Sequence, residues 1–191
     1  MGKKLSLKDK IVKMYKKNET AGMIYITFIK NRSEKDKREA IEIFIELAKV
    51  DIEDTILRAK ALAILGFFKD MCCGYKVEEY YKDGSIICDY QNIPKVIEDN
   101  CKEIIKTLES SEKIELQENT EFYEITSDVI HCLHSYQVDP NIVLKLFDLL
   151  EEKLNLEEKR KFEMNLKDHH INDQILRLRP KFKMPGQFVK P

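Results

Sequence analysis

The chain contains no tryptophan, and its 191 residues include only six glycines and five prolines. Because glycine and proline mark most turns, their scarcity predicts few turns and long helices. Long apolar runs are also missing: the longest, near residues 61–68, falls far short of the roughly 20 residues that a membrane-spanning helix needs. We therefore expect no membrane partner, and the length of the chain favours one domain.

Charge imbalance and a disulfide framework are missing as well. The 33 basic and 34 acidic residues leave a net charge of -1, which argues against nonspecific nucleic-acid or anionic-membrane binding as the main role but leaves a local patch open. Five cysteines at irregular spacing indicate a reducing, cytoplasmic compartment. No signal peptide is expected, and an ordinary cytosolic start explains Gly2 and Ser6 better than the loose myristoylation pattern they match.

The strongest pattern in the chain runs from Ala40 to Phe68 and contains two apolar stripes at the spacings of three and four that are typical of helices. The stripes are Ile41, Phe44, Ile45, Leu47 and Ala48, followed by Ile56, Leu57, Ala61, Ile64, Leu65 and Phe68. Only a short link near 50–52 separates them. The two helices should therefore pack as antiparallel neighbours.

Similar stripes and capping residues predict about eight helices in all, so the fold class is all-α. The other helices are expected near 6–17, 20–31, 94–109, 121–136, 140–154 and 156–168. Helix starts are indicated at Ser6, Thr20, Ser33, Asp139 and Asn155, and at either Asp51 or Asp54. The segment 20–31 is rich in β-branched and aromatic residues and would suit a buried strand, but its helical surroundings favour a helix.

The segment 75–91 differs in character from its surroundings. Two short runs, 77–82 and 85–90, flank Asp83-Gly84, a dipeptide that is typical of two-residue hairpin turns. We expect a short β-hairpin or ordered loop inserted near 77–90. The helical domain should then cover 1–176, with an extended basic tail over 177–191.

The segment 40–68 resembles a HEAT or armadillo-type helical repeat, in which AIEIFIELAKVD corresponds to the first helix and LRAKALAILG to the second. Arg58, Ala61, Leu65 and Gly66 stand where the family favours Arg, Ala, Leu and Gly. The resemblance covers about 30 residues and implies an α-solenoid that binds another protein without chemistry. Uneven spacing elsewhere keeps an irregular helical bundle as the alternative. The family's DNA-glycosylase branch fits poorly with a neutral chain that lacks tryptophan.

Histidine and cysteine offer few signs of catalysis. His131 and His134 are three residues apart on one predicted helix and could chelate a metal, but further ligands are missing and the apolar neighbours favour a histidine at a helix interface. Cys101 and Cys132 fit a core, and Cys88 is the cysteine most exposed to reaction. No catalytic constellation is recognisable, so we predict no catalytic residues and no cofactor.

Two segments are better candidates for partner binding. The insertion holds four tyrosines, a residue type enriched at binding hot spots, which could instead pack the insertion onto the helices. They are Tyr75, Tyr80, Tyr81 and Tyr90. The tail alternates basic and apolar side chains and could cross the body of the protein, engage an acidic partner, bind nucleic acid or stay disordered. Its candidate residues are Arg177, Arg179, Lys181, Phe182, Lys183 and Phe188.

The function predicted from the sequence is a non-catalytic protein-interaction module or adaptor. The expected contact surface combines the second helical pair with the insertion. The alternative is a nucleic-acid-binding helical repeat that uses a lysine-rich face and the basic tail.

Overall fold

The computed structural model describes residues 5–17, 19–74, 85–111 and 120–155. Across these ranges the backbone forms seven α-helices and one 3₁₀ helix, and no strand. The elements are α1 (Leu7–Tyr15), α2 (Ala21–Phe28), α3 (Glu34–Leu47), α4 (Thr55–Gly74), η1 (Ile86–Asp89), α6 (Ile93–Ser110), α7 (Thr120–Ser135) and α8 (Pro140–Lys153). The predicted all-α class is confirmed for this part of the chain, and no helix within it is long and apolar enough to cross a membrane.

Most helices begin where the sequence predicts a capping residue. Ser6 and Asp9 form a capping box, in which the Ser6 hydroxyl accepts from the Asp9 amide at 3.1 Å and the Asp9 carboxylate accepts from the Ser6 amide at 3.0 Å. The Thr20 and Ser33 hydroxyls cap α2 and α3. Of the two candidates for α4, Asp54 is the cap, since its Oδ1 accepts from the Leu57 amide at 2.9 Å. Each cap is worth about 1 kcal/mol.

The ambiguous segment 20–31 contains a helix, as predicted. The buried side chains of α2 are Ile24, Tyr25 and Phe28, spaced as one helix face requires. Tyr25 meets Phe67 and Phe68 of α4 edge-on, with ring centroids 6.2 and 6.0 Å apart. Packing of these aromatic rings therefore outweighs the strand propensity of the β-branched residues.

The prediction that residues 85–90 form the second strand of a β-hairpin is wrong. Residues 85–90 contain the 3₁₀ helix η1, whose following amide, of Tyr90, donates to the Ile87 carbonyl at 3.2 Å. Ile87 is buried, while Asp89 and Tyr90 reach across to α3. The conformation of residues 85–90 is therefore decided by their contacts with helix α3 and not by pairing with another strand. The first arm, 77–82, and the turn at Asp83-Gly84 lie outside the described residues.

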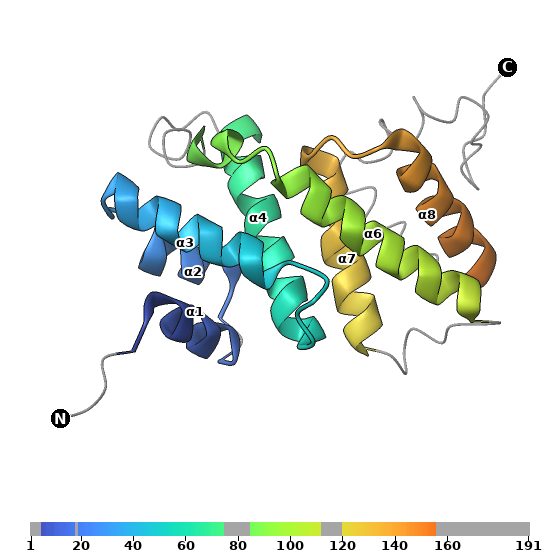
Figure 1. Ribbon diagram of the computed structural model, residues 1–191, viewed down its shortest axis with the longest axis horizontal. Coiled ribbons are helices and arrows are strands. Elements are labelled where there is room, and N and C mark those ends of the chain that lie inside the picture. The colour runs from blue at the N-terminus through green and yellow to red at the C-terminus, as the bar shows by residue number, and fades with distance from the viewer. Residues whose placement is uncertain (1–4, 18, 75–84, 112–119, 156–191) are drawn as a thin grey trace, which may run out of the picture.

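Helix α4 is the centre of the fold, with α1, α2, α3, η1 and α7 all packed against it. Its closest neighbour is α7, and the two run side by side in the same direction (Figure 1). The start of α4 at Thr55 faces the start of α7 at Glu121, and Asp70 near its other end faces Ser135. Parallel neighbouring helices require a return segment between them, which α6 supplies.

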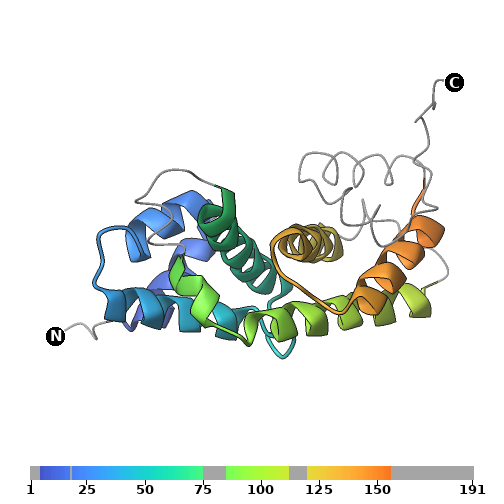
Figure 2. The same cartoon turned by 90° about the horizontal axis from the view of Figure 1, so that it is seen from above.

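Helices α3 and α6 form a second layer on one side of α4 and α7, as the view from above shows (Figure 2). The buried Asn100 side chain of α6 donates to the Ala48 carbonyl at the end of α3, at 2.9 Å, and to the Val96 carbonyl at 2.8 Å. Helix α8 packs against α6. The buried apolar residues from Ile11 to Leu154 form one hydrophobic cluster, in which Tyr15, Phe44 and Phe68 are among the largest fully buried side chains.

Gly66 of α4 lies directly against His131 and Cys132 of α7. A Cβ at this position would lie 2.5 Å from the His131 Cδ2 atom, nearer than real carbon contacts allow. We predict that Gly66→Ala destabilises the protein by about 1–2 kcal/mol, because the overlap outweighs the higher helix propensity of alanine. Urea unfolding measures the change.

Gly22→Ala is the matched control. A Cβ there meets only the Thr20 hydroxyl at 3.9 Å, so this substitution should leave stability unchanged or raise it by up to about 1 kcal/mol. Equal effects of the two substitutions would show that the approach of His131 to Gly66 does not limit the packing of α4 and α7.

Candidate partner-binding site

The structure describes one of the predicted contact tyrosines, Tyr90. Its ring is half-buried, and its hydroxyl donates to the Arg38 carbonyl of α3 at 3.3 Å. This residue therefore packs the end of the insertion onto a helix, as the alternative reading of the tyrosines expected. Tyr75, Tyr80 and Tyr81 lie outside the described residues. So do the six candidates of the tail, from Arg177 to Phe188, and all nine stay predictions.

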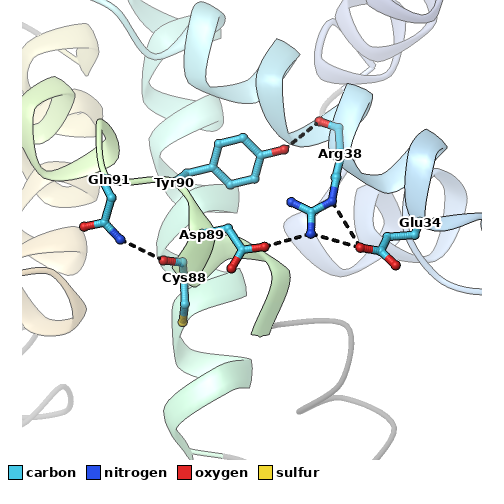
Figure 3. Close-up of polar contacts among 6 residues, drawn as sticks. All are labelled: Glu34, Arg38, Cys88, Asp89, Tyr90 and Gln91. Atoms are coloured by element: carbon cyan, nitrogen blue, oxygen red, sulfur yellow. Dashed lines mark hydrogen bonds and ion pairs between the residues drawn. The ribbon is translucent and has the colours of Figure 1, made fainter.

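Tyr90 belongs to a polar cluster that joins α3 to η1 (Figure 3). The Arg38 guanidinium donates through Nη2 to Asp89 Oδ2 at 2.7 Å. It also donates to Glu34 Oε1 from Nη2 at 2.9 Å and from Nε at 3.2 Å. These two hydrogen-bonded carboxylates raise the pKa of Arg38. The arginine is thus a fixed positive charge between two negative ones on the surface of the protein.

A second set of contacts joins η1 to α4. The Lys69 ammonium of α4 donates to Cys88 Sγ at 3.3 Å and lies 5.8 Å from the centre of the Tyr136 ring. Gln91 donates to the Cys88 carbonyl at 3.2 Å. Cys88 is exposed, as predicted, and Cys101 and Cys132 are buried. The segment that follows the insertion is therefore attached to both helices of the preceding pair.

His131, one of the two weak candidates for a metal ligand, forms an ion pair with α4. His131 Nε2 lies 3.1 Å from Asp70 Oδ2, and the Ser135 hydroxyl donates to Asp70 Oδ1. Within the described ranges, no group of three or more metal-ligating side chains occurs. The side chain of His134 lies outside the described part of the structure. His131 lies at a helix interface, against Gly66, as the reading from its apolar neighbours expected.

The cluster of Asp70, His131 and Ser135 lacks the arrangement that activates a nucleophile. A catalytic serine donates its proton to the histidine, and the carboxylate holds the other side of the imidazole. Here the serine and the histidine both bond to the same carboxylate. The hydrogen bond to Asp70 raises the pKa of His131, against the opposing effect of burial. The arrangement is that of an ion pair between two helices.

Asp128 adds a second carboxyl group one turn before His131. Burial raises the pKa of Asp128 to about 7. The charge of His131 lowers this pKa, and the charge of Glu124 raises it further. Asp70 and Asp128 were not identified from the sequence. The available signal was the spacing of Asp128, His131 and Ser135 at i, i+3 and i+7, which places all three on one face of α7.

Between α4, α6 and α7 the structure has a cleft of about 160 Å³. Arg58, one of the residues behind the repeat resemblance, lines it together with Glu103. The buried guanidinium bonds to both Glu103 oxygens, at 2.8 and 3.0 Å, and to the Val50 carbonyl at 3.0 Å. Arg58 therefore ties the link between α3 and α4 to α6, which is a structural role.

Comparisons with protein-family models, with curated proteins and with solved structures found no match for the chain. The geometry of the described residues is therefore the basis for any functional assignment.

Asp128 and His131 should make stability depend on pH. Both pKa values are raised, so the folded chain holds protons that the unfolded chain releases. The free energy of unfolding should fall as pH rises from about 4 to about 7, through the titration of Asp128. The contribution of the protonated His131 should be complete below about pH 6.5 and lost as pH rises through its folded pKa. We expect Asp128→Asn to flatten the lower part of this curve and to raise stability at pH 8 by on the order of 1–2 kcal/mol.

Urea unfolding at a series of pH values provides the measurement. Glu121→Gln removes an exposed carboxylate from the same helix and should keep the slope of the original chain. A slope between pH 4 and 7 that survives in Asp128→Asn would mean that Asp128 does not take up a proton on folding.

Proposed function

We propose that this chain is a non-catalytic, protein-binding module of the helical-repeat type, in which α3–α4 and α6–α7 are two successive repeat units. The observation that carries the proposal is the relation between equivalent helices. The second helices of the two units, α4 and α7, are parallel neighbours. The first helices, α3 and α6, lie in the other layer, where Asn100 of α6 bonds to Ala48 at the end of α3. Stacking of equivalent helices is the geometry that solenoids use to bury a continuous core.

Hydrogen bonds within each layer support this pairing. Tyr136 and Cys132 of the α7 segment donate to carbonyls of α4, at 2.8 Å to Leu65 and 3.2 Å to Leu62. In the other layer, Asn100 of α6 bonds to Ala48 beside α3. The irregular bundle that the sequence leaves as an alternative would not require α4 and α7 to be parallel neighbours.

We assign the contact surface of the module to the edge where α3, η1 and the end of α4 meet. Arg38, Glu34 and Asp89 place three charges there at half-buried or exposed positions. Gly74 at the end of α4 and Ser85 before η1 belong to this edge, and they flank Tyr75, Tyr80 and Tyr81 in the sequence. Solenoids bind partners through surfaces of this kind, where loops between helices gather. A cytoplasmic location is part of the same proposal.

The proposal predicts that the tyrosines of the insertion carry binding energy. Tyr80→Ala plus Tyr81→Ala should reduce the capture of a protein partner from the native cell at least about tenfold, since interface hot spots are each worth about 2 kcal/mol or more. Quantitative mass spectrometry of proteins retained on the immobilised chain measures this reduction.

The control is Lys106→Ala plus Lys145→Ala, which changes two exposed residues of α6 and α8 and should leave capture unchanged. Circular dichroism checks that each variant is folded. A folded Tyr80/Tyr81 variant that retains the same partners in the same amounts would exclude the insertion as the contact surface.

A further inference from the structure

Helix α2 exposes an apolar face to solvent. Met23 and Ile26 are 45 % and 55 % exposed, although both stand on a helix whose opposite face is buried in the core. From Thr20 to Ile29 the chain has no charged residue. Single exposed apolar residues are common, but two on one uncharged helix face are typical of an interaction surface.

The N-terminal part of the sequence, to which this face belongs, differs in net charge from the rest of the chain. The first 32 residues include nine basic and two acidic residues, whereas the remaining chain includes 24 basic and 32 acidic residues. Helix α1 and the residues just after it expose five lysines: Lys8, Lys10, Lys13, Lys16 and Lys17. In the part of the chain that the structure describes, Lys8 is the one of the five that forms an ion pair, with Glu46 at 3.6 Å.

Arg32 places a further positive charge beside the apolar face. Asn31 adopts a left-handed conformation with φ of 59°, which turns the chain back after α2. The Arg32 guanidinium then donates to the Thr27 carbonyl at 3.1 and 2.9 Å, and the Thr27 hydroxyl donates to the Met23 carbonyl at 2.8 Å. No carboxylate among the described residues pairs with Arg32, so its remaining N–H groups are available for a bidentate contact with an acidic group.

We propose that α1, α2 and Arg32 form a second docking surface, which binds an acidic amphipathic segment of a protein partner. In the bound state, apolar side chains of the segment cover Met23 and Ile26, and its carboxylates face the α1 lysines and Arg32. The inference rests on the proposed protein-binding function and extends it, because two separate surfaces would make the chain an adaptor between two proteins.

Charge decides between this occupant and the others. A second copy would bring two surfaces of the same positive charge together. The last 15 residues of the chain contain five basic and no acidic residues, so they would be repelled as well. Nucleic acid would satisfy the lysines but leave the apolar face without a partner, since phosphate groups are contacted by polar and basic side chains.

The test is a selection from a display library of random 16-residue peptides, carried out on the full chain at physiological salt. We expect the enriched peptides to carry net negative charge and apolar residues at spacings of three and four. Met23→Ser plus Ile26→Ser should weaken their binding at least about tenfold. Lys13→Glu plus Lys17→Glu should also weaken binding, and binding to the unmodified chain should decline with added salt.

The control is Val50→Ser, because this side chain is 41 % exposed but belongs to the link between α3 and α4. It should leave peptide binding unchanged, and so should Tyr80→Ala plus Tyr81→Ala. Retention of peptide binding in the tyrosine variant, together with unchanged capture of the native partner, would overturn the proposed insertion contact but support this surface.

Several results would overturn the inference. The first is that no peptides are enriched, and the second is that the enriched peptides carry no excess of acidic residues. The third is that the peptides bind the Met23/Ile26 variant as tightly as the unmodified chain. Three other properties would be tested in the unmodified chain: flotation with phosphatidylserine vesicles, binding to a DNA duplex, and dimerisation in sedimentation. Any of them would also count against the inference if the Met23/Ile26 variant lost that property but still bound the peptides.

Discussion

The close contact between α4 and α7 is the constraint on which the rest of the structure depends. Every described element before η1 packs on α4, and α6 reaches this group through α7 and through Arg58. The contact needs a glycine at position 66, because the imidazole of His131 occupies the space that a Cβ would take. Helices that approach this closely gain dispersion energy along their whole length.

The same contact holds two acid–base groups whose pKa values are raised, Asp128 and His131. Asp70, Asp128 and His131 lie between or beside the two helices, and burial raises the pKa of Asp128 to about 7. Partly buried charge of this kind costs free energy unless it is paired. The ion pair of Asp70 with His131 offsets that cost for one carboxylate, and proton uptake offsets it for the other.

Much of the fold could be predicted from the sequence, because helix ends and buried faces are local properties. The stripe of α6, the caps at Ser6 and Thr20 and the link after α3 depend on residues a few positions apart. The conformation of 85–90 could not be predicted in this way, since it depends on the distant Arg38. For the same reason the pairing of Asp70 with His131, which are 61 positions apart in the sequence, was missed.

The residues that contact one another are separated by different distances along the sequence in the two layers of the fold. Contacts between α3 and the η1–α6 segment join residues 51 or 52 positions apart. Contacts between α4 and the α7 segment join residues 61 to 71 positions apart. An alignment of the sequence with itself at one fixed offset can therefore match the contacting residues of one layer but not those of the other. The two repeat units that we propose would therefore leave almost no periodic trace in the order of the amino acids.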